Sequence, residues 1–454
     1  MPAITARDRT ILIPGDPGWD DARKAWNLAV DQRPAAVALP TSPQDVVAAI
    51  QYARDHGLRA AAQGTGHNAA PLGPLADTVL VKTSAMRRVS IDPAARIARV
   101  EAGAVWQEIA NAAAKHGLAA LAGSSPDVGV AGYTLGGGMS WLSRAYGLAA
   151  NNVQAIELVT ADGRPVRADA GTEPDLFWAL RGGGGSFGVV TAIELRLFPI
   201  TEVYAGLLWW PAGTAPQVLQ VLHAWRELTQ GGLPDEFTTT ARLMNFPPIP
   251  DIPEQIRGRS FTVIDVIHLG AAAEADRLLA PLRALDPVTD SIQKIPVPAL
   301  GHLHMDPDRP VPAAGDGRLL TTLPKRAIDE IIAAADPGPA SPLLTVELRH
   351  LGGEIRRARP GNGALAAVDA DYLVFAGGLA ATPELTAAID ARVAALMSAV
   401  SPWAARQLYL NFTETSRDPA SFWRPEVYER LRRIKAAVDP ANLIRANHPI
   451  PLAQ

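Results

Sequence analysis

Three glycine-rich clusters lie within the first 190 residues of this 454-residue chain, and they constrain its fold more than any other feature. They occupy positions 64–66, 123–138 and 182–188. A tight turn needs one glycine, whereas a backbone that approaches a ligand closely needs several, because a Cβ would stand in the way. Backbone N–H groups gathered by such loops suit the oxygens of a diphosphate. The clusters therefore favour a domain that holds a long anionic ligand against bare backbone.

The first cluster follows a short apolar run, 58–62, and reads Gly-Thr-Gly-His-Asn over 64–68. It begins like a dinucleotide-binding fingerprint, but Ala69 occupies the place of the third glycine. That fingerprint must also open a helix, and the residues after the cluster predict a loop instead. The Rossmann interpretation therefore fails, and His67 is left beside whatever the loop holds.

The segments around this loop have the pattern of an α/β layer. Buried strands are predicted at 35–39 and 58–62, and the apolar spacing of 45–56 predicts a helix between them. Ser42 is a good N-cap for that helix, and Gly57 ends it. A further helix is predicted over 19–30.

The pattern changes near residue 200. Runs with period-2 alternation predict strands, and helical runs separate them, which is typical of one sheet with helices on a single face. The predicted strands are 237–243, 261–268, 343–350 and 372–376, and the predicted helices are 216–228, 272–284 and 383–399. A last short strand is predicted at 409–412. The fold class expected is α+β.

Composition excludes several classes of function. The chain has no cysteine, which rules out disulfides, thiolate metal sites and cysteine-linked cofactors. A net charge of −4 gives no reason to expect nucleic-acid or anionic-membrane partners. The first residues lack the apolar region of a secretory signal, and no apolar stretch is long enough to span a bilayer, so a cytoplasmic location is expected.

Two other patterns have simpler explanations. The stretch 184–188 matches the Gly-x-Ser-x-Gly nucleophile elbow, but a predicted helix precedes it and a strand follows, the reverse of the order that a hydrolase needs. The histidines of 301–306, at alternate positions, could suit a metal, but no third ligand cluster supports one. An exposed loop is expected there, and no metal site is predicted.

The motifs together resemble the berberine bridge enzyme-like branch of the vanillyl-alcohol oxidase superfamily. The matches are the 64–68 loop, the Gly-x-x-x-x-Val-Gly-Val-x-Gly pattern that begins at Gly123, the runs 146–153 and 175–191, and the C-terminal segments 409–412 and 428–451. The resemblance implies an FAD-linked oxidoreductase with a bilobal PCMH-type FAD-binding domain. It implies FAD-binding residues 1–200 (core 34–199), a substrate domain over 201–404 and a C-terminal segment, 405–454, that returns to the FAD domain.

The resemblance also assigns the cofactor contacts. Backbone N–H groups of 64–68 and 124–127 would hold the diphosphate, and 129–132 would pass close to the ring. The residues expected to contact FAD are Gln63, Gly64, Thr65, Gly66, His67, Asn68, Ser124, Ser125, Asp127, Val128, Val130, Gly132, Tyr133, Val190, Asn411 and Asn447.

Departures from the family pattern narrow the chemistry. Ser125 stands where members with two covalent links have a cysteine, so FAD can have one covalent bond at most, through His67 to the 8α carbon. Phe412 replaces a tyrosine that serves as, or assists, the base in sugar-oxidising members. No acid corresponding to the base of the plant alkaloid members is found near Ala380. Val130 stands at the position that controls oxygen access, and valine there resembles the oxidases.

The catalytic candidates come from alternation and resemblance. In the strand at 343–350, Glu347 and Arg349 share one face, opposite the apolar residues that helices would cover. That face points towards the flavin, although the two side chains could equally pair with each other. Tyr409 shares a face with Asn411, and Tyr133 stands where many members have histidine. Glu347, Tyr409 and Tyr133 are therefore the predicted catalytic residues.

These residues favour an FAD-dependent oxidase that takes hydride from an alcohol, amine or C–H donor of a small molecule, with dioxygen as acceptor and hydrogen peroxide as product. A dehydrogenase with another acceptor, or a catalytically silent flavin-binding protein, is the alternative. A natural-product tailoring step is as compatible as oxidation of a sugar or an alkaloid. Oligomeric state is open. The aromatic residues that could line the substrate site, or simply pack in the core, are Trp209, Trp210, Phe237 and Tyr372.

Overall fold

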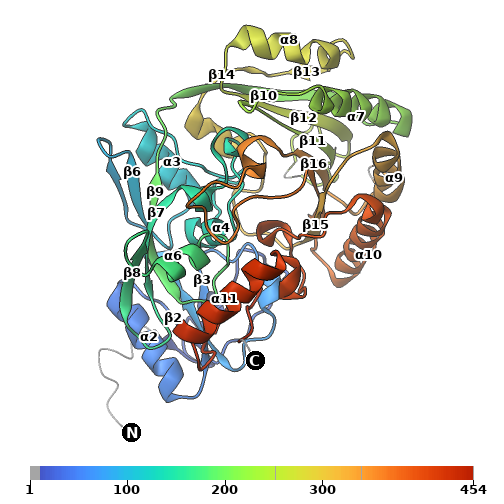
Figure 1. The fold of residues 1–454 in the computed structure, drawn as a ribbon. Coiled ribbons are helices and arrows are strands. Elements are labelled where there is room, and N and C mark those ends of the chain that lie inside the picture. The colour runs from blue at the N-terminus through green and yellow to red at the C-terminus, as the bar shows by residue number, and fades with distance from the viewer. Residues whose placement is uncertain (1–10, 251, 339, 453–454) are drawn as a thin grey trace.

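The computed structural model describes residues 11–250, 252–338 and 340–452. Figure 1 shows two smaller sheets in the half of the molecule that holds the N-terminus and a larger sheet in the other half, with helices along its outer side. The α+β prediction is confirmed.

The first sheet contains the strand that leads into the 64–68 loop. Its order is β1-β2-β4-β3-β18, and β2, β4, β3 and β18 run parallel. The strands are β1 (Ile11–Leu12), β2 (Ala36–Ala38), β3 (Arg59–Gln63), β4 (Thr78–Lys82) and β18 (Ile444–Arg445). Helix α2 (Pro43–Asp55) covers one face, and its N-terminus is capped by Ser42, whose Oγ accepts a hydrogen bond from the N–H of Asp45 at 3.2 Å.

The second sheet is antiparallel, in the order β5-β6-β9-β7-β8. Its strands are β5 (Val89–Asp92), β6 (Ile97–Glu101), β7 (Val153–Val159), β8 (Pro165–Asp169) and β9 (Val189–Arg196). Its core includes residues of α3 (Trp106–Ala114), α4 (Val130–Leu135), α6 (Pro174–Leu180) and α11 (Pro425–Val438). The glycine clusters lie in the connections of these two sheets.

The third sheet comes entirely from residues 202–379. Its order is β13-β10-β12-β11-β16-β17-β15, with β14 also paired to β10. The strands are β10 (Glu202–Pro211), β11 (Phe237–Asn245), β12 (Ser260–His268), β13 (Thr289–Asp290), β14 (Gln293–Pro296), β15 (Ala313–Leu320), β16 (Thr345–His350) and β17 (Tyr372–Leu379). A single apolar core joins one face of this sheet to α7 (Ala215–Gln230), α8 (Ala272–Arg283), α9 (Lys325–Ala335) and α10 (Pro383–Ala399).

Two sequence predictions near the N- and C-terminal ends are wrong. The predicted helix over 19–30 ends early, as α1 (Trp19–Ala22), because later backbone donors bind elsewhere: the N–H of Trp26 donates to the Thr65 carbonyl at 2.9 Å. The predicted strand at 409–412 is the 3-10 helix η8 (Leu410–Phe412), because the N–H of Phe412 closes a turn onto the Tyr409 carbonyl at 3.1 Å.

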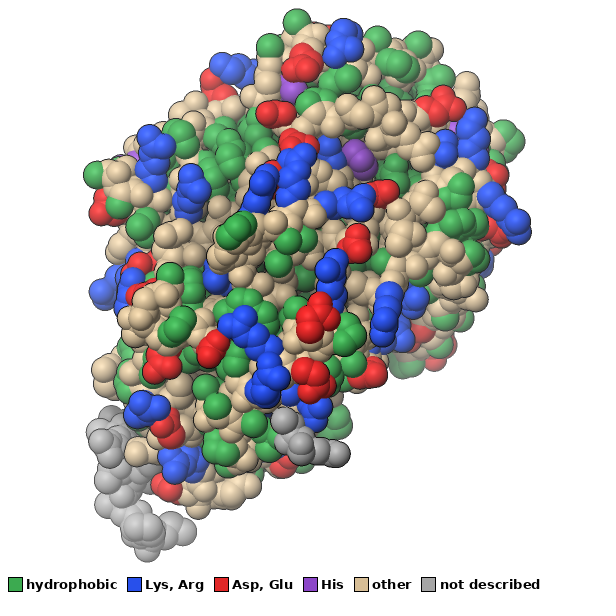
Figure 2. All heavy atoms as spheres, in the orientation of Figure 1, with side chains coloured by type: hydrophobic (Ala, Val, Ile, Leu, Met, Phe, Trp, Pro, Cys, Tyr) green, Lys and Arg blue, Asp and Glu red, His purple; other side chains and the backbone are tan. Residues whose placement is uncertain are grey.

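The remaining helical pieces are short. They are α5 (Ser143–Tyr146), η2 (Ala70–Leu72), η3 (Thr83–Ala85), η4 (Ala149–Asn152), η5 (Val297–His302), η6 (Gly353–Arg356), η7 (Ser401–Trp403) and η9 (Pro419–Ser421). Among the described residues, no helix is both long and apolar enough to cross a membrane. On the face shown in Figure 2, basic and acidic side chains are interspersed.

Candidate active site

A cavity of about 390 Å³ lies between the glycine clusters and the third sheet. Most of the predicted cofactor residues line it. They are Gln63, Gly64, Thr65, Gly66, His67, Asn68, Ser124, Ser125, Val128, Gly132, Tyr133, Val190, Asn411 and Asn447. Asp127 and Val130 do not line the cavity. Asp127 contacts the cavity-lining residue His67, and Val130 is buried in the core of the second sheet.

The loop after β3 is held in place from both sides. Gly66 has a φ of +89°, and a Cβ there would lie 2.9 Å from the Cβ of Ala25, so only glycine fits this turn. The side-chain amide of Asn68 donates to the carbonyls of Leu410 and Thr413 at 3.2 and 3.1 Å. The C-terminal segment therefore fixes the loop that sequence analysis placed around the cofactor.

His67 has a defined orientation. Its ring stacks on Trp26, with centroids 3.9 Å apart and planes 19° from parallel, and its Nε2 lies 3.2 Å from Asp127 Oδ1. Burial alone would raise the pKa of Asp127, but its contact with His67 and the hydrogen bonds from Trp26 and Ser125 hold it below its ordinary value. Asp127 therefore remains an anion at ion-pair distance from Nε2, which has no hydrogen-bond partner among the described residues.

The second glycine cluster forms a helix that the sequence analysis did not predict. Helix α4 starts after Gly129, and the chain leaves it at Gly136. A Cβ at Gly136 would lie 1.9 Å from Asn411 Oδ1, so glycine is required for the two segments to approach. The Asn411 amide donates to the Tyr133 carbonyl at 2.9 Å. This contact links α4 to the C-terminal segment.

The cavity wall fits a long ligand that offers both oxygens and a flat ring. A Cβ at Gly132 would meet nothing within 4 Å, and one at Gly185 only Ala446 at 3.8 Å, so bare backbone faces open space. Among the described residues, Asn68 Oδ1 and Asn411 Oδ1 are buried without a hydrogen-bond partner. Buried polar atoms of this kind normally have partners. The residues present therefore fit a bound dinucleotide such as FAD.

The opposite wall comes from the third sheet. Arg242, Glu347, Phe375 and Gly317 form one row across β11, β16, β17 and β15. Glu347, Arg349 and Phe375 line the cavity, whereas their strand neighbours such as Val346 belong to the helix-covered core. The alternation along 343–350 thus places Glu347 and Arg349 on the cavity side.

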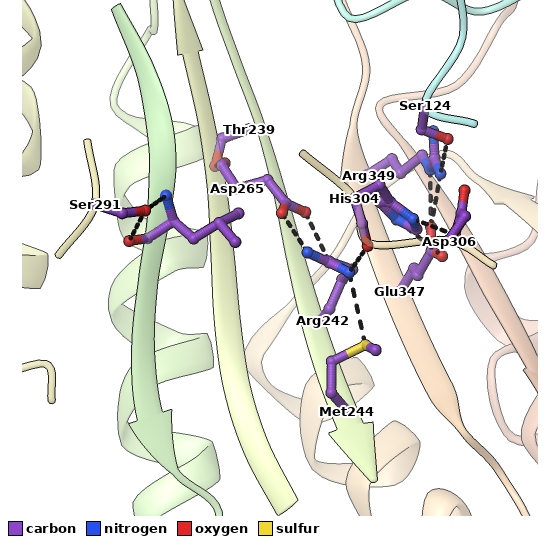
Figure 3. A network of polar contacts seen from close by, with 11 residues as sticks. Ser124, Thr239, Arg242, Met244, Asp265, Ser291, His304, Asp306, Glu347 and Arg349 are labelled. Atoms are coloured by element: carbon purple, nitrogen blue, oxygen red, sulfur yellow. Dashed lines mark hydrogen bonds and ion pairs between the residues drawn. The ribbon is translucent and has the colours of Figure 1, made fainter. Parts of the chain in front are cut away.

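These two residues belong to a buried charge network (Figure 3). His304 lies between two carboxylates, with Nδ1 2.7 Å from Asp306 and Nε2 3.2 Å from Glu347. Arg349 donates to Glu347 at 2.9 Å and to Ser124 at 3.2 Å, and its guanidinium lies 4.8 Å from the centre of the Phe412 ring. The network thereby connects the sheet to the second glycine cluster.

The network fixes the charges of its members. Burial alone would lower the pKa of His304, but Asp306 and Glu347 raise it to about 9. Burial alone would raise the pKa of Glu347, but Arg349 and His304 hold it well below its ordinary value. Glu347 is therefore an anion held between two cations at neutral pH.

A separate ion pair lies next to this network and supports the backbone of His304. Arg242 and Asp265 are fully buried side chains, joined by two hydrogen bonds of 2.8 and 2.5 Å. Arg242 also donates to the backbone carbonyl of His304 at 2.7 Å (Figure 3). The position of the His304 loop thus depends on a charge pair located on β11 and β12.

The two tyrosines predicted as catalytic have buried hydroxyl groups. The Tyr133 hydroxyl donates to the Leu121 carbonyl at 3.1 Å, and burial raises the pKa of Tyr133 well above its ordinary value. Tyr409 is buried behind Phe412 and does not line the cavity, and burial raises its pKa as well. The four aromatic candidates also lie away from the cavity: Trp209, Trp210, Phe237 and Tyr372 pack in the cores of the third sheet.

The exposure of individual side chains bears on two further sequence patterns, the 301–306 stretch and the Gly-x-Ser-x-Gly match at 184–188. The 301–306 stretch is not simply an exposed loop, because His304 is buried on the cavity wall while His302 is exposed. Within the described residues, no group of histidine and carboxylate side chains could hold a metal ion. Ser186 is 1% exposed, its Oγ accepts from the N–H of Ile450 at 3.1 Å, and strand β9 follows it, as the inverted elbow pattern predicts.

Sequence analysis missed several cavity residues. Trp26 lay in a predicted helix, and His304 and Asp306 were assigned to a surface loop. Glu414, two positions after Phe412, also lines the cavity and had attracted no attention. The His-x-Asp spacing of 304–306 was the one available signal, since it allows the ring and the carboxylate to pair; Glu414 had none.

Two family models and several known proteins match this chain. A family model described as "FAD binding domain" matches residues 34–169, and one described as "Berberine and berberine like" matches 408–451. The chain is 30% identical to (R)-6-hydroxynicotine oxidase of Paenarthrobacter nicotinovorans, over 97% of this chain and 96% of the relative. It is also 30% identical to xylooligosaccharide oxidase of Thermothelomyces thermophilus, over 64% of this chain and 56% of that one.

Solved structures agree. The crystal structure of 6-hydroxy-D-nicotine oxidase from Arthrobacter nicotinovorans superposes with a TM-score of 0.80 at 28% identity, covering 97% of both chains. Physcomitrella patens BBE-like 1 reaches a TM-score of 0.84 at 22% identity, over 98% of this chain and 97% of that one, which supports the fold alone.

Proposed function

This chain belongs to the berberine bridge enzyme-like family of FAD-linked oxidoreductases, and we propose that, as an FAD-dependent oxidase, it oxidises a small alcohol or amine at the cavity between the glycine clusters and the third sheet. The observation that carries the proposal is the cavity itself. Bare backbone and unpartnered amide oxygens lie on one wall, and a charged, partly aromatic wall faces them.

We assign the wall with the glycine clusters to the cofactor. The loops 64–68 and 124–127 would hold the diphosphate, and Asn411 and Asn447 would contact the ring system. We assign the single covalent bond to His67, whose ring lies on the cavity wall beside Asp127. The sheets support a cofactor domain over 1–200, a substrate domain over 201–404 and a returning segment over 405–454.

We assign the third-sheet wall to the substrate. When bound, FAD would supply the acceptor for the hydride that leaves the donor carbon, with dioxygen as the electron acceptor and hydrogen peroxide as the product. Glu347, kept ionised by Arg349 and His304, binds the donor by accepting a hydrogen bond from a polar group other than the one that is oxidised. Phe375 and Phe412 exclude water beside it and pack against the donor's carbon skeleton.

Two measurements test the function. Purified protein is mixed anaerobically with a donor panel that includes 6-hydroxynicotine, xylobiose and glucose, and bleaching of the flavin is followed; peroxide release is then measured in air. Bleaching with peroxide release supports the oxidase. Bleaching that only an artificial acceptor reverses would indicate a dehydrogenase, and no bleaching by any donor would favour a silent flavin-binding protein.

Removal of the Asp127 charge is expected to impair covalent attachment. Asp127→Asn keeps the side-chain shape but no longer fixes which ring nitrogen of His67 faces the cavity. We expect a mixture of linked and free flavin after expression, with the linked fraction below that of the wild type. Flavin fluorescence of the denatured protein band, relative to total flavin, measures it. A fully linked variant would contradict the orienting role.

Glu347→Gln should weaken donor binding while leaving the flavin content unchanged. The substitution removes the anion between Arg349 and His304, and a charge-assisted hydrogen bond to the donor is replaced by a neutral one. An increase of about tenfold in the donor's apparent Kd is expected, since a charge-assisted bond exceeds a neutral one by about 1–1.5 kcal/mol. Titration of anaerobic bleaching rates against donor concentration measures it, and an unchanged Kd would contradict the assignment.

A further inference from the structure

Glu414 presents an uncommitted carboxyl to the same cavity. It lies two residues after η8, is half-buried and lines the wall together with Phe412 and Ala313. Within residues 11–250, 252–338 and 340–452, no side chain or backbone donor binds its carboxyl oxygens. Carboxylates below the protein surface are normally hydrogen-bonded or paired. An unpaired one that faces a substrate cavity is therefore available to a substrate.

The charged group that acts on Glu414 is another carboxylate, Asp316. Asp316 on β15 accepts hydrogen bonds from the backbone N–H of Gly317 and Glu414 at 3.0 and 3.1 Å. It also accepts from Thr415 Oγ1 at 2.8 Å and from Arg417 at 2.5 Å. Four donors therefore bind the carboxylate of Asp316. Its charge, together with burial, raises the pKa of Glu414 to about 7.

The two carboxylates of the cavity thus have different properties. Glu347 is held as an anion by two cations and has little affinity for a proton. Glu414 has no cation and gains or loses its proton near neutral pH. A pair of acids whose environments separate their proton affinities is the usual arrangement for dividing acid–base roles in a site.

We propose that Glu414 is the proton acceptor of this cavity and takes the O–H or N–H proton of the donor during oxidation. The inference rests on the proposed function and deepens it. Conversion of a CH–OH or CH–NH group to C=O or C=N removes two electrons and two hydrogens. One hydrogen leaves with the C–H electron pair as hydride to bound FAD. The other leaves as a proton to the Glu414 carboxylate, and the electron pair of the broken O–H or N–H bond forms the new double bond.

The proposal sets a pH dependence with a definite sign. Glu414 must be ionised to accept a proton, so the rate of anaerobic bleaching should rise as pH increases through about 7 and then level off. The charged groups beside the pair are Arg417, which binds Asp316, and His448, whose pKa burial lowers to about 4. His448 therefore does not titrate in the same range.

Three variants test the proposal. Glu414→Gln should lower the bleaching rate at pH 8 by about 10²–10³-fold and abolish the rise near pH 7. Asp316→Asn, which removes the neighbouring charge and keeps an acceptor oxygen, should move that rise to lower pH. Glu330→Gln, on α9 and away from the cavity, should behave as the wild type. The donor used is the member of the panel that bleaches the wild type fastest.

A measurement without any donor separates failure of this inference from failure of the proposed function. In an infrared pH titration of the flavin-loaded protein, wild type minus Glu414→Gln should show one carboxylic C=O band that disappears near pH 7. Absence of that band, or bleaching by Glu414→Gln within threefold of the wild type, overturns the role of Glu414. If no donor bleaches the wild type but the band is present, the proposed oxidase function is wrong, whereas the assignment to Glu414 of a carboxyl group that loses its proton near pH 7 is retained.

Discussion

His67→Ala is expected to yield protein whose acid precipitate is colourless, whereas the wild-type precipitate is yellow. The reason lies in the contacts of the ring. Trp26 and Asp127 hold the His67 ring on the cavity wall, and the chain has no cysteine that could carry a second link. All peptide-bound flavin should therefore be lost, while FAD still binds reversibly to the glycine loops.

Reversible binding makes the stability of this variant depend on FAD concentration. A ligand that binds only the folded state stabilises it by about 2.7 kcal/mol at 100 times its Kd, so the Tm of His67→Ala should rise with added FAD. The wild type, which the proposed covalent bond would keep saturated with flavin, should not respond. His116→Ala, an exposed histidine just beyond α3, serves as the control and should give a yellow precipitate. A yellow His67→Ala precipitate would place the link elsewhere, and a colourless wild type would mean that no link forms.

Elements with a strong local pattern could be predicted from sequence. The alternation of 343–350 identifies the face of Glu347 and Arg349, because a strand covered by helices on one side must put its polar residues on the other. The Ser42 cap and Gly57 similarly define α2. In these cases neighbours in sequence determine which way a side chain points.

The rest of the site depends on contacts between distant segments. His304 looks like part of an exposed loop until Arg242, 62 residues earlier, binds its carbonyl. Trp26 leaves a predicted helix because its N–H binds Thr65. The pKa of Glu414 is raised by its burial and by the charge of Asp316, which is 98 residues away in the chain. Such environments have no local signature, so sequence analysis could not identify them.

Arg242→Met is expected to destabilise strongly the third sheet, which carries the cavity wall. It leaves Asp265 as an unpaired charge with a fully buried side chain and removes the donor to the His304 carbonyl. Breaking a buried ion pair on one side costs about 3–5 kcal/mol. Over a domain of this size the Tm should fall by roughly 6–20 °C, measured by differential scanning calorimetry on the flavin-loaded protein.

A double variant distinguishes the effect of the Arg242–Asp265 pair on stability from its effect on donor binding. Arg242→Met with Asp265→Leu removes both charges and should recover most of the lost Tm, because a buried pair replaced by apolar side chains is often neutral in stability. It cannot restore the hydrogen bond to His304, so the loop that places the imidazole between Asp306 and Glu347 stays loosened. The recovered protein should still bind the donor more weakly than the wild type. A double variant with both normal stability and normal donor Kd would show that the ion pair supports the fold alone and has no part in positioning His304.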